Sequence, residues 1–258
     1  MNGRYKKIEY EKSSEDPMKY LTIDTTTKVT AVSLADDGCL IAEGFLHTSK
    51  KHSERLIPML DQLLKAASWT LQELEMIGVV RGPGSFTGIR IGIATAQGLA
   101  QVLKIPLLAV LSLDALAWAG LGRVEDIVPI LDARKNEWYT ARYRWTKDHE
   151  KAECLTLPQA IPTELWLEHL NGLDRPICFV GDATVKYKAQ IEELLGERAV
   201  VLPEYVSLPR GAYAARAIWQ RWQETGVGEL VEPFYIRFSE AEVNWAKKEE
   251  ARRTTEYE

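Results

Sequence analysis

Apolar and polar positions alternate in the first part of the chain in the way that β-strands require. Residues 20–23, YLTI, form a short predicted strand that ends at Asp24, and the side chains of residues 29–34 alternate between the two faces of a second strand. A turn is expected at 36–38, because its glycine adopts a positive φ without steric cost. A third run follows at 39–46, so the pattern predicts an antiparallel meander of three strands.

The apolar positions then change to helical spacing. Residues 53–67 carry one apolar stripe, which consists of Leu56, Ile57, Leu60, Leu63, Leu64 and Ala67. A buried strand at 77–80 leads through a glycine-rich loop into a long helix, which is predicted from 85 to 103. A strand at 105–110 and an Ala- and Leu-rich helix starting at Ser112 complete the first half.

The succession of strands and helices begins again after Gly122. Strands are predicted at 127–131, which ends at Asp132, at 137–145 and at 177–180, and helices at 165–170, 184–195 and 210–224. Strands followed by helices, twice over, predict an α/β chain with two lobes. The predicted division is a disordered extension at 1–17, an N-terminal lobe at 18–120, a C-terminal lobe at 121–238 and a flexible tail at 239–258.

The loop that follows the strand at 77–80 reads RGPGSFTGIRIG and suggests a phosphate cradle. A P-loop needs GxxxxGK[ST], but Thr87 stands at the place of the second glycine and no lysine follows Gly88. A dinucleotide fingerprint needs GxGxxG, whereas the spacing here is one residue longer. A bare helix N-terminus contributes only about 0.3–1 kcal/mol per charge, so this loop alone does not predict a nucleotide site.

Small residues recur every four positions through the loop and the long helix. Gly84, Gly88, Gly92, Ala96 and Ala100 would form one ridge on a single helix face. Each helical glycine costs about 1 kcal/mol relative to alanine, so close packing must offset this cost. The pattern leaves two explanations open: contact with a helix of a partner, or packing inside this chain.

Composition narrows the classes of function. The chain has 258 residues, of which 46% are apolar, and a formal net charge of -5. No strong basic surface for RNA or DNA is indicated, and no apolar run approaches the roughly 20 residues that span a membrane. The three cysteines form no CxxC pair, which favours reduced thiols in a cytoplasmic protein.

The glycine loop, together with MKYLTIDTTT, HSERLIP, LDARKNEWY and PFYIR, resembles the TsaB (YeaZ-like) family of bacterial tRNA threonylcarbamoyladenosine biosynthesis proteins. The resemblance covers 18–237. It implies the actin/sugar-kinase-like ATPase fold, with two lobes that are each a mixed sheet flanked by helices. It also implies a homodimer, a catalytic paralogue, TsaD, that modifies the adenosine 3′ of the tRNA anticodon, and a small ATPase, TsaE. Contact with tRNA is expected only through that complex.

In this family the contact face is formed by the helices that match 53–67 and 85–101, which favours the partner explanation of the glycine ridge. The interface residues expected from the resemblance are His52, Leu56, Leu60, Gly84, Phe86, Thr87, Gly88, Arg90, Ile91, Gly92, Thr95 and Ala96.

Active enzymes of this fold bind ATP through three glycine-bearing turns, and these turns are altered here. The first reads Asp24-Thr-Thr-Thr, the second begins Asp132-Ala-Arg, and the third has Gly181 followed by Asp182 in place of a glycine pair. Asp24 and Asp132 are weak nucleotide-binding candidates, and the alternative role is to form turns at strand ends. Ser85 is expected to cap a helix and not to act as a nucleophile.

The metal-binding pair of histidines four residues apart, which the catalytic sister family carries on a helix, does not occur in this sequence. No metal and no catalytic residue are therefore expected. No cofactor is expected in the isolated chain, whereas ATP or ADP is compatible with a junction between this chain and a partner.

Two hypotheses follow. The first is a non-catalytic dimerisation or scaffold subunit that supports the TsaD-like paralogue. The second is an independent ATP-dependent phosphotransferase of the sugar-kinase type, which the retained Asp24 and Asp132 motivate.

Overall fold

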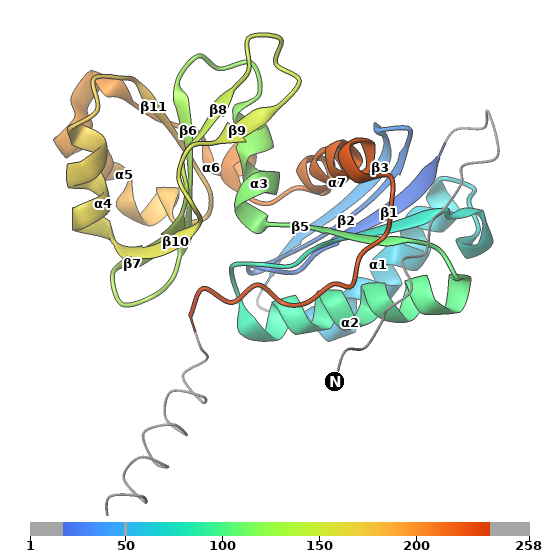
Figure 1. Ribbon diagram of the computed structural model, residues 1–258. Coiled ribbons are helices and arrows are strands. Elements are labelled where there is room, and N and C mark those ends of the chain that lie inside the picture. The colour runs from blue at the N-terminus through green and yellow to red at the C-terminus, as the bar shows by residue number, and fades with distance from the viewer. Residues whose placement is uncertain (1–17, 49–50, 238–258) are drawn as a thin grey trace, which may run out of the picture.

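The computed structural model describes residues 18–48 and 51–237 (Figure 1). The predicted extension at 1–17 and tail at 239–258 lie outside these residues. The first lobe is built on a five-stranded sheet in the order β3-β2-β1-β4-β5. Its strands are β1 (Lys19–Asp24), β2 (Val29–Asp36), β3 (Cys39–His47), β4 (Met76–Val80) and β5 (Leu107–Val110).

The first sheet is mixed: β1, β2 and β3 form the predicted antiparallel meander, and β1, β4 and β5 run parallel. The helices α1 (His52–Ala66) and α2 (Phe86–Leu103) lie side by side below it, and α3 (Ser112–Ala117) and α7 (Gly211–Thr225) lie above it (Figure 1). Because both faces of the sheet are covered, β4 is buried at every position.

The second lobe is built on a seven-stranded mixed sheet. Five of its strands follow the order β10-β7-β6-β11-β12, while β8 pairs with β6 and with β9. The strands are β6 (Asp126–Asp132), β7 (Glu137–Thr140), β8 (Tyr143–Trp145), β9 (Ala152–Cys154), β10 (Gln159–Pro162), β11 (Ile177–Val180) and β12 (Ala199–Val201). The helices are α4 (Thr163–Asn171), α5 (Thr184–Leu195) and α6 (Glu204–Ser207).

Three short 3-10 helices, Leu71–Glu73, Trp118–Gly120 and Gly196–Arg198, complete the described elements. The predicted fold class, two lobes that are each a mixed sheet flanked by helices, is confirmed. The predicted long helix and the helices at 184–195 and 210–224 are found within one residue of their expected bounds.

The last helix departs from the predicted division of the chain. The predicted C-terminal lobe at 121–238 includes this helix, but α7 packs on the first sheet (Figure 1). The hydroxyl of Tyr20 donates to the carbonyl of Ala215 at 3.1 Å, and that of Ser33 donates to the carbonyl of Gly211 at 2.9 Å. The chain returns because the upper face of the first sheet is apolar and needs this cover.

Candidate functional site

The glycine-rich loop carries the chain from β4 into α2 and is bound to its own surroundings. The amide of Ser85 donates to the carbonyl of Thr26 at 2.6 Å. The hydroxyl of Ser112 donates to the carbonyl of Pro83 at 2.5 Å. The side chain of Ser85 accepts from the amide of Gly88 at 3.3 Å, so its predicted role as a helix cap is confirmed.

The glycine ridge faces the interior of the first lobe. A Cβ atom at Gly88 would lie 2.0 Å from the carbonyl oxygen of Thr25, and one at Gly84 would lie 2.1 Å from that of Thr26. A Cβ at Gly92 would lie 2.5 Å from the Thr25 hydroxyl. Such distances are not tolerated between non-bonded heavy atoms. The ridge therefore packs against the turn after β1, and the expectation that it contacts a partner is corrected.

The turn after β1 is closed from the side of α2. Asp24 is 3% exposed, and its Oδ1 accepts from the amide of Thr26 at 2.9 Å and from the Thr26 hydroxyl at 2.7 Å. The hydroxyl of Thr25 donates to the carbonyl of Gly88 at 2.7 Å. Burial raises the pKa of Asp24, and its two hydrogen bonds lower it by less. The arrangement is that of a turn-forming aspartate at a strand end.

The corresponding turn of the second lobe is more open. Asp132 is exposed, and its Oδ1 accepts from the amide of Arg134 at 2.9 Å. Its amide donates to Oδ1 of Asp182 at 3.1 Å, and burial raises the pKa of Asp182. Gly181 has a φ of +112°, and a Cβ there would lie 2.1 Å from the carbonyl oxygen of Ile130. This glycine serves the packing of its own lobe.

These three turns do not fit the phosphates of ATP. A phosphate needs backbone that it can approach closely, which is why glycine is common in such loops. At the first turn, Gly84 and Gly88 already lie against the carbonyl groups, and Asp24 holds the amide of Thr26. Asp132 remains accessible, but one exposed carboxylate does not form a nucleotide site by itself.

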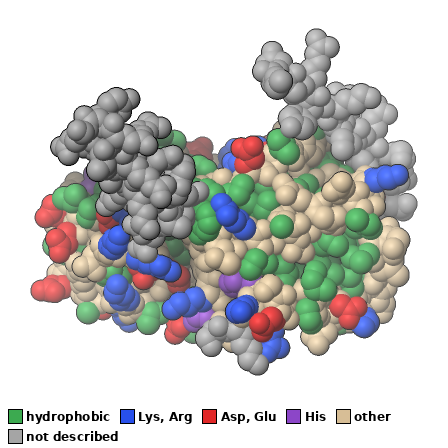
Figure 2. Space-filling view, turned by 90° about the horizontal axis from the view of Figure 1, so that it is seen from below, with side chains coloured by type: hydrophobic (Ala, Val, Ile, Leu, Met, Phe, Trp, Pro, Cys, Tyr) green, Lys and Arg blue, Asp and Glu red, His purple; other side chains and the backbone are tan. Residues whose placement is uncertain are grey.

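The outer surface of α1 and α2 has a different character. Arg90 is the sole charged residue in the sequence of α2, and exposed positions on this helix include Ala94, Gly98 and Val102. A Cβ at Gly98 would meet nothing within 4 Å, and Val102 is 81% exposed. Figure 2, which views the molecule from the side of these helices, shows mostly uncharged and apolar atoms over the first lobe. A surface helix with so little charge is typical of a contact face.

The expected interface residues separate into two groups in the structure. Leu56, Leu60, Gly88, Gly92 and Ala96 are buried in the first lobe, so they are core residues of this chain and not surface residues. Thr87 and Arg90 are exposed, and Gly84, Phe86, Ile91 and Thr95 are half-buried. The stripe of Leu56 and Leu60 was recognised correctly as apolar, but it is directed toward the sheet.

His52 fastens the start of α1 to the hairpin between β1 and β2. Its Nε2 lies 2.9 Å from the carbonyl oxygen of Thr27, and its Nδ1 lies 2.7 Å from the Thr30 hydroxyl. Nε2 therefore donates, and Nδ1 accepts in the neutral ring. Burial lowers the pKa of His52, and the hydrogen bond to Thr27 raises it by less. The half-buried ring is thus committed to the chain's own backbone.

The C-terminal segment brings Tyr235 to the outer face of α2, which the sequence patterns did not predict. The ring of Tyr235 stacks on that of Phe86 with centroids 4.8 Å apart. Nε of Arg90 donates to the hydroxyl of Tyr235 at 2.9 Å, and the guanidinium carbon lies 3.8 Å from the centroid of the Phe86 ring. The PFYIR motif was the available signal, but only folding brings it beside α2.

The described residues hold neither a cluster of metal ligands nor a helix that could cross a membrane. No group of three or more His, Cys, Asp and Glu side chains in 18–48 and 51–237 is arranged to hold a metal ion. Within the same ranges, every helix is too short or too polar to cross a bilayer.

Known proteins resemble this chain over most of its length. A threonylcarbamoyladenosine biosynthesis protein TsaB from Bacillus subtilis is 35% identical, covering 90% of this chain and 100% of that protein. The chain belongs to the TsaB family. The TsaB of Escherichia coli is 34% identical over 60% of this chain and 68% of that protein. The family model described as TsaD, tRNA N6-adenosine threonylcarbamoyltransferase, matches 46–245.

Solved structures agree with this assignment. A structure described as YeaZ from Pseudomonas aeruginosa has a TM-score of 0.70 and 26% identity, covering 84% of this chain and 99% of that one. The expected TsaB (YeaZ-like) family is thus confirmed. Membership connects the protein with the biosynthesis of threonylcarbamoyladenosine in tRNA.

Proposed function

We propose that this protein is a non-catalytic scaffold subunit of the complex that transfers threonylcarbamoyl to the tRNA adenosine 3′ of the anticodon. The observation that carries the proposal is the closed turn after β1. Gly84 and Gly88 lie against the carbonyl groups of Thr25 and Thr26, where an active enzyme of this fold would leave room for phosphate. The retained Asp24 holds its own turn.

The outer face of α1 and α2 is the proposed contact surface for a TsaD-like catalytic paralogue. The exposed stretch of Ala94, Gly98 and Val102 on α2 has no charge to desolvate when a partner docks. The exposed Gly98 costs helix stability by about 1 kcal/mol against alanine. Among the described residues, nothing explains that cost, because a Cβ at Gly98 would meet no atom within 4 Å. Close approach of a partner helix would explain it.

The same face would join two copies of this chain when the paralogue is absent. In the proposed complex, a TsaE-like small ATPase joins the two subunits in the cytoplasm, and ATP or ADP binds at a junction to which the partner contributes. The main contacts with tRNA are made by the complex and not by the isolated chain, in keeping with the net charge of -5.

A substitution at Gly98 tests the contact surface. Gly98→Arg places a long charged side chain on the outer face without an internal clash, since a Cβ meets nothing within 4 Å. We expect the variant to unfold at or above the wild-type temperature, because arginine has a higher helix propensity than glycine. It should bind the purified paralogue at least about tenfold more weakly, about 1.4 kcal/mol. Gly98→Ala, which adds a single methyl group at the same position, is the matched comparison and should weaken assembly by less than Gly98→Arg. Unchanged assembly of Gly98→Arg, measured by complex mass, would remove this surface from the proposal.

The non-catalytic role is tested separately by calorimetry. The isolated chain should show no binding of Mg-ATP at micromolar concentrations, and tRNA modification reconstituted with the paralogue should require this chain. Tight Mg-ATP binding that Asp24→Ala abolishes would favour the independent phosphotransferase instead.

A further inference from the structure

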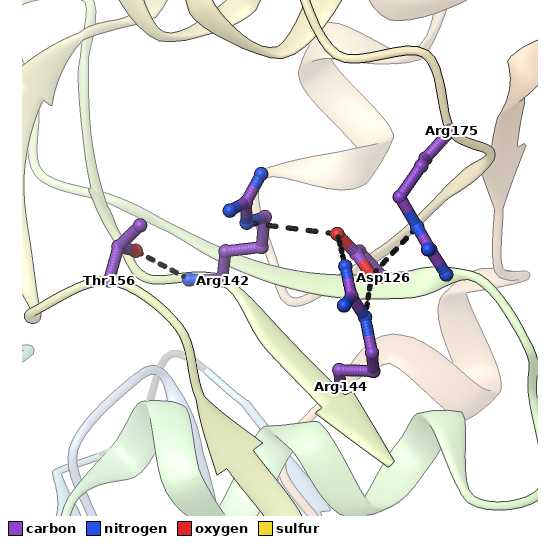
Figure 3. Close-up of polar contacts among 5 residues, drawn as sticks. All are labelled: Asp126, Arg142, Arg144, Thr156 and Arg175. Carbon is purple, nitrogen blue, oxygen red and sulfur yellow. Dashed lines mark hydrogen bonds and ion pairs between the residues drawn. The ribbon is translucent and has the colours of Figure 1, made fainter. Parts of the chain in front are cut away.

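Three arginine side chains converge on one buried carboxylate at the end of the second sheet (Figure 3). Asp126, the first residue of β6, is fully buried and forms ion pairs with Arg142, Arg144 and Arg175. Arg142 and Arg144 lie on one side of the chain because side chains alternate along a strand, and Tyr143 between them is buried in the core. Arg175 comes from the segment just before β11.

One of these arginines is enough to neutralise Asp126. Nε and Nη2 of Arg144 donate to Oδ1 and Oδ2 of Asp126 at 2.7 Å and 3.0 Å, which is a bidentate pair. Nε of Arg142 stays at 3.7 Å and Nε of Arg175 at 3.5 Å, longer than ordinary hydrogen bonds. Nε of Arg142 is buried and has no hydrogen-bond partner among the described residues.

Two acidic residues near Asp126 face other arginines than Arg142 and Arg175. Glu153 lies opposite Arg144 in the register of β8 and β9, and Glu125 pairs with Arg123 at 3.3 Å. In the described part of the chain, Asp126 is the carboxylate that pairs with both Arg142 and Arg175. Two guanidinium groups, each with five donors, thus remain beside a carboxylate that Arg144 satisfies.

Arginine side chains that lie close together repel one another, and a bound anion between them would offset this repulsion. The fork of a guanidinium group matches the oxygen atoms of a phosphate in particular. Arg175 is 45% exposed, so a phosphate can approach it directly from solvent, and Arg142 keeps 17% of its side chain exposed. We propose that Arg142 and Arg175, positioned by Asp126 and Arg144, contact a backbone phosphate of tRNA.

This inference rests on the proposed function and gives this subunit a local share in holding the substrate RNA. The formal charge of -5 argues against a broad RNA surface, but a contact with one or two phosphates needs only a local site. The face of α1 and α2 stays available for the paralogue, because Asp126 and its arginines belong to the second lobe.

The test uses the complex of this chain with its paralogue and a tRNA transcript that reads a codon beginning with A. Affinity is measured across a series of salt concentrations for wild type and for the double variant Arg142→Gln/Arg175→Gln. We expect about tenfold weaker binding and a salt slope smaller by about 1–2, since each phosphate contact contributes close to 0.9. Arg144 still neutralises Asp126, so the unfolding temperature should stay near that of wild type.

The matched control is Lys188→Gln/Arg221→Gln, which also removes two positive charges. Each of these residues already pairs with one glutamate, Lys188 with Glu192 and Arg221 with Glu229. The control should keep the wild-type salt slope. Loss of an equal amount of affinity in both double variants would overturn the proposal, because net charge would then explain the effect.

Two further outcomes overturn the inference without affecting the proposed function. One is an unchanged affinity and salt slope in the arginine variant while the complex still assembles. The other is a loss of paralogue binding, which would make the cluster a protein contact. If the wild-type chain fails to bind the paralogue, the proposed function fails. The isolated chain is then titrated with the same transcript at a series of low salt concentrations. Equal salt slopes of RNA binding for wild type and the arginine variant would then overturn the phosphate contact.

Discussion

The two sheets of this protein share one strand order but treat the turn after the first strand differently. In the order β3-β2-β1-β4-β5, β1 corresponds to β6 in β10-β7-β6-β11-β12, and both strands end at an aspartate. Asp24 is buried at the turn whose Thr25 and Thr26 lie against Gly84 and Gly88, whereas Asp132 is exposed. The same topology therefore gives a sealed turn in one lobe and an accessible turn in the other.

The difference comes from the helix that follows β4 in the first sheet and the helix that follows β11 in the second. α2 has 18 residues and approaches β1 through glycines, so that it fills the space beside the turn. α5 has 12 residues and starts after Gly181 with no side-chain cap. A shared fold thus fixes where a ligand turn would lie, while local side-chain size decides whether it stays open.

The largest expected difference in stability is between alanine substitutions at two glycines of α2. Gly88→Ala should destabilise the protein by at least about 3 kcal/mol, because its Cβ would lie 2.0 Å from the Thr25 carbonyl oxygen. Gly98→Ala should instead stabilise it by about 0.5–1 kcal/mol, since the space is open. Urea unfolding measures both, and similar effects at the two positions would contradict the sealed turn.

The two aspartates provide the next test of the comparison. Asp24→Ala should cost about 1–3 kcal/mol, because the buried amide of Thr26 loses its acceptor. Asp132→Ala should cost roughly 0.5 kcal/mol or less, since water can replace the exposed carboxylate. Asp24→Asn, which keeps an acceptor oxygen, is the control. Equal costs for the two alanine variants in denaturant titrations would show that the turns do not differ in this way.

Removing the helix cap should have a smaller effect. Ser85→Ala removes the oxygen that accepts from the Gly88 amide, and we expect a loss of about 1 kcal/mol in unfolding free energy. Ser85→Asp, which keeps a capping oxygen, should retain most of the stability. Thermal denaturation distinguishes the two variants. Equal melting temperatures for wild type and Ser85→Ala would show that the cap does not contribute to stability.

The smallest expected effect is the pH dependence contributed by His52. Because burial lowers its pKa in the folded state, the unfolded chain binds the proton more readily. Its contribution to stability is therefore present above the unfolded pKa, about 6.5, and decreases as the pH falls through and below that value. In His52→Gln the unfolding free energy should change less between neutral and mildly acid pH. A steeper dependence in the variant would reverse the assigned sign.

Much of the architecture was predictable because it depends on local patterns. Alternation identified the meander, and helical spacing placed α2 within one residue of its observed start. The capping role of Ser85 followed from chain neighbours alone, since the amide that it binds is three residues away. The TsaB family was also recognisable from the order and content of short motifs.

The direction in which the small-residue ridge points was not predictable from spacing. Gly88 and Gly98 lie on one helix, but the first faces the Thr25 carbonyl and the second faces solvent. A spacing of four residues shows that small side chains share one face of the helix, but it does not show what that face packs against. The place of Tyr235 beside Arg90 depends on a contact between residues 145 positions apart.

The sequence by itself determined the order of strands and helices, the family and the loss of glycines at the phosphate turns, because each is a property of neighbouring residues. Only the tertiary structure decided that α7 returns to the first sheet, that α2 seals the turn at Asp24, and that three arginines meet at Asp126. These features join residues distant in the chain, so they depend on how apolar faces are buried together.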